Sequence, residues 1–148
     1  MLVMLVKERM SPRFITIDPD ASLAEARALL DQHRIRHLPV VEEGSLIGII
    51  TDRDIRSAAS GSSLDRVKVG AAMTRKVITV TPETHIQQAA KLLLANKIGG
   101  LPVLKAGALQ GIITETDLLN ALVEIMDRAT MERIAPDYQH RTMTVVDL

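Results

Sequence analysis

The chain has 148 residues, of which 47% are hydrophobic, so it is long enough and apolar enough for one domain with a real core. Its 18 basic and 18 acidic residues cancel, and it contains one Phe and one Tyr, so neither a basic surface nor aromatic stacking indicates nucleic-acid binding. It has no cysteine, which excludes a disulfide framework. The opening MLVMLV is too short to cross a membrane and lacks the basic leader of a signal peptide, so we expect a cytoplasmic protein without a membrane partner.

The two halves of the sequence repeat without a gap. Met10 and Met73 are separated by 63 residues, and so are Pro39 and Pro102. At this spacing more than a third of the aligned positions are identical, and most of the others keep their chemical character. Two copies of a unit this long indicate a duplicated half-domain with two-fold pseudo-symmetry. One copy alone buries little surface, so we expect the halves to share one core.

Each repeat opens with a short extended segment, at 14–17 in the first copy and at 77–80 in the second. Later in each copy, two short runs rich in Val and Ile flank a turn at Gly44 or Gly107. Runs of this length and composition around a glycine predict a β-hairpin.

A helix is predicted between the extended segment and the hairpin of each repeat. Ser22 and Glu25 have the spacing of a capping box before an apolar helical face. In the second repeat Thr84 and Gln87 provide the box, one position out of register with the first. Another helix is predicted after each hairpin, which gives the order β-α-β-β-α twice.

The repeats also predict the organisation of the chain. The first repeat spans 4–60, a linker 61–68, and the second repeat 69–123. In the remaining segment, 124–148, an apolar stripe continues the last helix until Pro136, and the end of the chain alternates like a strand.

The motif I-x-x-L-P-V precedes each hairpin and G-I-I-T-x-x-D follows it, twice and in register. In these motifs the chain resembles a tandem cystathionine-β-synthase (CBS) domain pair, or Bateman module, over about residues 4–123. Within that family it is similar to small stand-alone bacterial or archaeal proteins of the acetoin-utilisation type. The resemblance implies an α/β (α+β) fold of two pseudo-symmetric repeats. It also implies a non-catalytic regulatory module that binds AMP, ADP, ATP or S-adenosylmethionine between the repeats, and a flat homodimer formed through the CBS helices. The regulated protein is left open, and so is the alternative of a ligand-free dimer that serves as an interaction platform.

Two T-x-x-D motifs, Thr51 to Asp54 and Thr114 to Asp117, stand at the predicted helix starts. Their spacing is close to that of a structural capping box. The same helix end offers unpaired N–H groups to a phosphate. In the family the matching threonine and aspartate contact phosphate and ribose, so the resemblance implies two ligand sites.

The two copies differ in charge. Arg53 in the first motif offers a planar guanidinium to phosphate, whereas Thr116 takes that place in the second. The first site is therefore predicted to be the better one for a phosphorylated ligand.

The residues before each L-P-V differ in the same direction. Arg36 and His37 are charged or titratable, whereas Gly99 and Gly100 replace them in the second repeat. The first pair would supply charge to a phosphate and the glycines would open space for a base. The alternatives are a solvated arginine, a strand-edge histidine and a simple loop kink.

Other residues enter the prediction through the family's cleft-lining segments, although Thr16 and Thr79 also fit plain β-propensity. The predicted ligand-binding residues of the first repeat are Thr16, Ile17, Arg36, His37, Leu38, Pro39, Thr51, Arg53 and Asp54. Those of the second repeat are Thr79, Val80, Gly100, Leu101, Pro102, Thr114, Thr116 and Asp117. The four histidines lack metal-ligand spacing and no nucleophile motif is present, so we expect no metal, no required cofactor and no catalysis.

Overall fold

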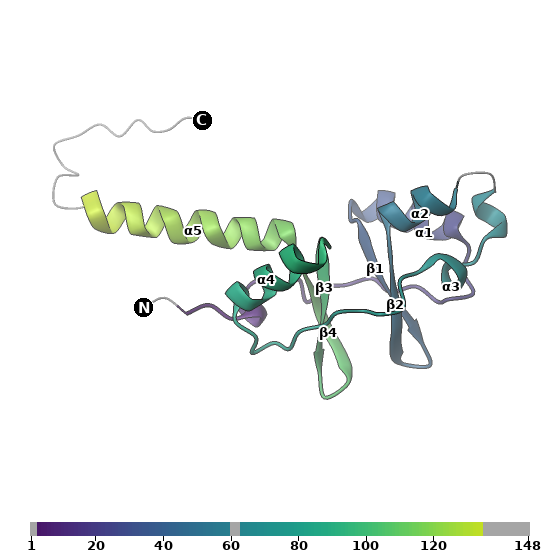
Figure 1. The fold of residues 1–148 in the computed structure, drawn as a ribbon, viewed down its shortest axis with the longest axis horizontal. Helices are drawn as coiled ribbons and strands as arrows, with labels where there is room; N and C mark the ends of the chain where they lie inside the picture. Colours follow the sequence, from purple (N-terminus) through teal and green to yellow (C-terminus); the bar gives the residue numbers. More distant parts are fainter. Residues whose placement is uncertain (1–2, 60–62, 135–148) are drawn as a thin grey trace.

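A computed structural model of the chain describes residues 3–59 and 63–134 (Figure 1). The first repeat contains α1 (Leu23–His33), β1 (His37–Glu42), β2 (Ser45–Thr51) and α2 (Asp52–Ala58). The second contains α4 (Ile86–Asn96), β3 (Gly100–Lys105), β4 (Ala108–Thr114) and α5 (Glu115–Ile134). Short helical turns precede them: η1 (Val6–Glu8), η2 (Leu64–Arg66) and α3 (Val69–Ala72). The predicted mixed fold of two matching repeats is confirmed.

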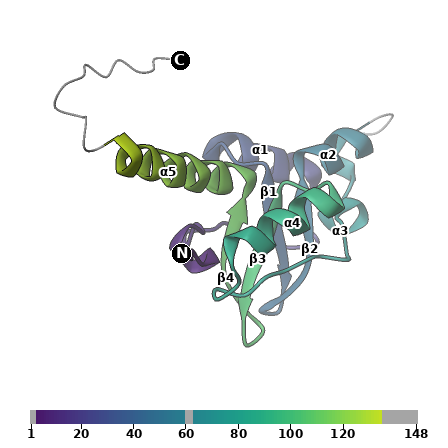
Figure 2. The same cartoon turned by 60° about the vertical axis from the view of Figure 1, so that its left-hand side comes forward.

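The two hairpins are built alike and stand side by side with their turns at the same end (Figures 1 and 2). Each turn has two left-handed residues, with φ of 79° at Gly44 and 81° at Gly107, as tight two-residue turns require. The predicted opening strands are reduced to single parallel bridges, Ile17 to Val40 and Val80 to Val103. Both copies therefore keep the predicted order with a minimal first strand.

The helix starts agree with the prediction in one repeat and differ in the other. Ser22 caps α1, and its hydroxyl accepts a hydrogen bond from the N–H of Glu25 at 3.1 Å. The predicted box of Thr84 and Gln87 is wrong, because α4 begins after His85, in register with the first repeat. The hydroxyl of Thr84 instead accepts from the N–H of Thr81 in the preceding turn.

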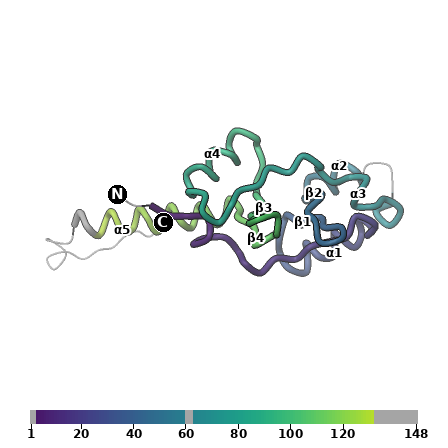
Figure 3. The backbone as a smooth tube through the Cα atoms, turned by 90° about the horizontal axis from the view of Figure 1, so that it is seen from below, coloured from purple at the N-terminus to yellow at the C-terminus, as the bar shows by residue number. Residues whose placement is uncertain are grey.

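Each repeat is completed by a segment from the other half of the sequence. The N–H of Val6 donates to the carbonyl of Thr84 at 2.8 Å, and the N–H of Val69 donates to the carbonyl of Ala21 at 2.8 Å. Val6 and Val69 have no exposed surface, and each lies in the core of the repeat that it joins. The described residues thus form two core clusters instead of the single shared core expected, and the exchanged segments connect the two repeats (Figure 3).

The exchange also explains the glycine of each G-I-I-T motif. A Cβ on Gly48 would lie 2.5 Å from the Met73 sulfur, and a Cβ on Gly111 would lie 2.5 Å from the carbonyl oxygen of Ser11. Because the exchanged segment crosses each hairpin here, these positions exclude any side chain.

Helix α5 runs well beyond the second repeat (Figure 1). Over residues 3–59 and 63–134, no helix combines the length and apolar character needed to cross a membrane. The predicted strand-like tail lies outside the described residues, and so do residues 60–62, where the first repeat meets the linker.

Candidate functional site

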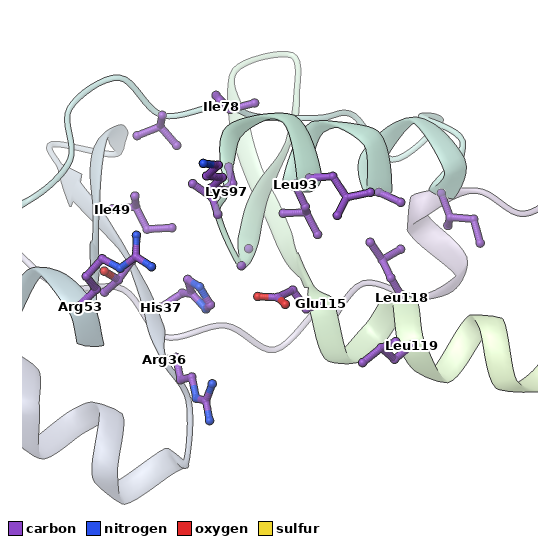
Figure 4. Close-up of a pocket in the computed structure, with 18 of the residues that line it drawn as sticks. Arg36, His37, Ile49, Arg53, Ile78, Leu93, Lys97, Glu115, Leu118 and Leu119 are labelled. Atoms are coloured by element: carbon purple, nitrogen blue, oxygen red, sulfur yellow. The ribbon is translucent and has the colours of Figure 1, made fainter.

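A cleft of about 1230 Å³ lies between the two repeats. One wall comes from the start of β1, the end of β2 and the start of α2. The opposite wall comes from the segment before α4, from α4 and from the start of α5. Figure 4 shows Arg53 and Ile49 at one end, His37 and Glu115 in the middle, and Leu118 and Leu119 at the other end. The cleft therefore has a charged part and an apolar part.

The first T-x-x-D motif forms a complete capping box at the cleft. The N–H of Thr51 donates to Asp54 Oδ2 at 3.0 Å, and the N–H of Asp54 donates to Thr51 Oγ1 at 3.1 Å. The structural interpretation of the motif is thus correct for this repeat. The Thr51 hydroxyl accepts in this box and has no acceptor of its own among the described residues, so its hydrogen can be donated to a ligand.

Cationic side chains surround this end of the cleft. Arg53 and Arg36 are exposed, and so are Lys76 and Lys97 on the opposite wall. None of the four forms an ion pair within the described part of the chain. Asp52, in contrast, is held by Arg27 at 2.6 Å and by Arg56 at 3.1 Å. The hydrogen bond from Arg27 holds the pKa of the Asp52 carboxyl below its usual value.

His37 fills the space that the two glycines of the other repeat leave open. A Cβ on Gly100 would lie 3.1 Å from His37 Cγ, and a Cβ on Gly99 would lie 3.1 Å from His37 Nε2 and 2.6 Å from Glu115 Oε1. Burial lowers the pKa of His37, against the opposite effect of the nearby Glu115 carboxylate. The glycines therefore accommodate an imidazole of this chain, which had not been foreseen.

The second T-x-x-D motif is capped more tightly. Asp117 Oδ2 accepts both the N–H of Thr114, at 2.8 Å, and its hydroxyl, at 3.1 Å. Neither residue lines the cleft, whereas the neighbouring Glu115 does. The two motifs thus differ in their surroundings as well as in sequence.

The cleft brings together six of the predicted residues: Arg36, His37, Thr51, Arg53, Asp54 and Gly100. The others lie outside its lining. Six of them are buried: Ile17, Leu38, Pro39, Val80, Leu101 and Pro102. Thr16 is exposed and Thr79 is half-buried, whereas Thr114 ends β4 and Thr116 and Asp117 lie in the first turn of α5.

Of the cleft residues that the other repeat contributes, the predicted set contained only Gly100. Thr74, Lys76, Val77 and Ile78 line the cleft from the segment that leads into the second repeat. Thr74 reaches this position because it pairs with Ile49 in the first hairpin. That pairing joins residues far apart in sequence, and no local pattern indicates it.

The residues described in the structure contain no group of three or more His, Cys, Asp or Glu side chains placed to hold a metal ion. The cleft thus offers donors, cations and apolar surface for an organic ligand.

Paired hairpins, exchanged segments and a cleft between the repeats define a tandem-repeat module. The chain belongs to the CBS domain family, whose model matches residues 6–61 and 69–124. This confirms the family resemblance drawn from the L-P-V and T-x-x-D motifs.

Among curated proteins, a CBS domain-containing protein of Dictyostelium discoideum is 39% identical over 136 residues, which cover 83% of this chain and 94% of the relative. An inosine-5'-monophosphate dehydrogenase of Korarchaeum cryptofilum is 42% identical over 105 residues, which cover 70% of this chain but 21% of the enzyme. The match to the enzyme thus spans about a fifth of its length.

Solved structures show the same fold. The CBS domain pair of protein MJ0100, solved in complex with 5'-methylthioadenosine and S-adenosyl-L-methionine, has a TM-score of 0.77 at 33% identity and covers 83% of this chain and 98% of its own. A protein assigned to acetoin utilization (AcuB) in Vibrio cholerae has a TM-score of 0.76 at 30% identity, with 85% and 95% covered. CBSX2 in complex with AMP has a TM-score of 0.71 at 30% identity, with 82% and 98% covered.

Proposed function

We propose that the protein is a cytoplasmic, non-catalytic regulatory module that binds an adenine nucleotide in the cleft between its repeats and acts as a homodimer. The observation that carries the proposal is the cleft itself. It joins the T-x-x-D turn of one repeat to a cationic wall of the other. Two structural relatives solved with adenosyl ligands support this choice of ligand class.

In the proposed binding mode, the phosphate lies near Arg53 and the start of α2. Arg53, Lys76 and Lys97 have no carboxylate partner among the described residues, so the negative charge of a phosphate would neutralise their positive charge. The free hydrogen of the Thr51 hydroxyl can donate to a phosphate or ribose oxygen. Asp54 has a second carboxylate oxygen, beyond the one used in the capping box, for a ribose hydroxyl.

The base would lie against the apolar side chains between the repeats. Ile49 and Ile78 face the cleft from the two repeats, and Val77 lies beside Ile78. Such a sandwich of aliphatic side chains suits a flat, weakly polar ring. We propose that the ligand links the two repeats and favours one arrangement of them, which is how a ligand shifts a conformational equilibrium.

A thermal-shift screen tests this proposal. AMP, ADP, ATP, S-adenosyl-L-methionine and adenosine are added separately in excess, with GMP as the control for the base. A ligand of the native state raises the melting temperature by mass action, and about 100-fold excess over the dissociation constant adds about 2.7 kcal/mol. We expect AMP or a longer adenine nucleotide to raise it and GMP to have little effect.

The second candidate is a ligand-free interaction platform. The observation in its favour is that His37 occupies the space over Gly99 and Gly100, and that both T-x-x-D motifs are already satisfied as capping boxes. A screen in which every adenosyl compound leaves the melting temperature unchanged would favour this candidate and contradict the sensor.

A further inference from the structure

One carboxylate in the middle of the cleft lacks a counter-ion. Glu115, the first residue of α5, is exposed and lines the cleft beside His37 (Figure 4). A Cβ on Gly99 would meet both this carboxylate and the His37 ring. Within residues 3–59 and 63–134, Glu115 forms no ion pair. Its negative charge therefore acts on whatever occupies the centre of the cleft.

The equivalent carboxylate of the first repeat, Asp52, has two counter-ions. It contacts Arg27 at 2.6 Å and Arg56 at 3.1 Å. At the repeat spacing, Ala90 and Leu119 take the positions of these two arginines, and both line the cleft. The side chains that would neutralise the second carboxylate are thus replaced by apolar ones. The two repeats share the position of the acid but not its charge balance.

The unpaired charges that line the cleft are unequal in number. Four cations have no counter-ion in the described part of the chain: Arg36, Arg53, Lys76 and Lys97. Asp54 and Glu115 are unpaired carboxylates, whereas Asp52 and Arg56 cancel each other. With the histidines counted as neutral, the cleft has an excess of two positive charges. A phosphate monoester carries a charge of about −1.5 to −2 at neutral pH, which matches this excess.

We propose that Glu115 is a specificity-determining residue, which makes the cleft select a nucleoside monophosphate over nucleotides with longer phosphate chains. The proposal rests on the adenine nucleotide of the proposed function and narrows it to one class of nucleotide. With the first phosphate at Arg53, a longer chain that follows the cleft passes His37 and approaches Glu115 (Figure 4).

The physical basis of the selection is repulsion between like charges. A second or third phosphate would exceed the positive charge of the cleft and would meet the Glu115 carboxylate beside apolar side chains, where water screens charges less than in bulk solvent. Unfavourable charge contacts of this kind are a general means of rejecting a competing ligand. Asp52 would not act in this way, because its two arginines neutralise it.

Calorimetric titration with AMP, ADP and ATP tests the selection, in buffer with EDTA so that metal ions do not neutralise the phosphates. The parent should bind AMP at least about fivefold more tightly than ATP, with ADP between them. Glu115→Gln should lower this ratio by at least about fivefold, mainly by tightening ATP. The matched control is Glu83→Gln, which removes the same charge from an exposed position of the second repeat outside the cleft. It should change the ratio by less than about twofold, because solvent screens a distant exposed charge.

Because Glu115 is exposed and glutamine keeps its shape, the variant should fold, and its melting curve checks this. If it misfolds, Glu115→Ala makes the same test. A parent that binds ATP as tightly as AMP, or an unchanged ratio in the Glu115 variant, would overturn the proposal and leave the adenine nucleotide standing. An equal change in Glu83→Gln would also overturn it, because the net charge of the chain would then be the cause. A parent that binds no adenine nucleotide would contradict the proposed function and this inference together.

Discussion

The contact of His37 with Gly100 joins the two repeats, and Gly100→Ala perturbs it with a single methyl group. The new Cβ would lie 3.1 Å from His37 Cγ and 3.2 Å from Cδ2 and Nδ1, where an ordinary contact is 3.4 Å or more. Gly100 does not have a positive φ, so the backbone accepts alanine without strain. The imidazole must therefore shift by a few tenths of an ångström within a packed site. Overpacking of this kind costs about 1–3 kcal/mol of unfolding free energy.

The assay is a double-mutant cycle measured by urea unfolding, with His37→Ala as the second variant. For a chain of this length, each kcal/mol corresponds to about 2–4 °C in melting temperature. In the His37→Ala background the added methyl group meets no ring, so Gly100→Ala should be neutral or slightly stabilising. The coupling between the two positions should be at least about 1 kcal/mol. Equal effects of Gly100→Ala in both backgrounds would refute the proposed packing.

Two further predictions concern stability. Val6→Ala should lower the unfolding free energy by about 1–3 kcal/mol, because Val6 is fully buried in the core of the other repeat. Val69→Ala should have a similar effect. A loss below about 0.5 kcal/mol in urea unfolding would contradict the segment exchange. Burial lowers the pKa of His37 from its ordinary 6.5, so below pH 6.5 the unfolded chain binds more protons than the folded one. The free energy of unfolding should therefore fall as the pH drops through the lowered pKa. His37→Gln should reduce that slope, and an identical slope in the variant would show that another group causes it.

The sequence allowed the repeat architecture to be predicted because the signals for it are local. Gly44 and Gly107 fix left-handed turns between Val- and Ile-rich runs, and both hairpins form with the same register. Ser22 caps the helix that it was expected to cap. The box at Thr84 failed because a threonine next to a turn can satisfy the turn instead of the helix, and the turn at Thr81 takes its hydroxyl.

The candidate site was predictable only in part, because half of it depends on long-range packing. The residues on the first repeat's side of the cleft were found through motifs in one stretch of sequence, as with Thr51 and Arg53. The opposite wall follows from the exchange that pairs Thr74 with Ile49, which no hydrophobic period encodes. The contact of His37 with Gly100 was missed for the same reason, since each residue was assessed within its own repeat.

Calorimetric titration with AMP and adenosine tests whether an adenine nucleotide binds with its phosphate at the first T-x-x-D turn, as we propose. Charge-assisted hydrogen bonds are worth about 1.5–3 kcal/mol, and about 1.4 kcal/mol corresponds to a tenfold change in affinity. Arg53→Ala should therefore weaken AMP by roughly tenfold to a hundredfold and leave adenosine nearly unchanged. Asp117→Ala, at the turn outside the cleft, should bind AMP nearly as the parent does. An Arg53→Ala variant that binds AMP like the parent, with Asp117→Ala unable to bind it, would contradict the assignment.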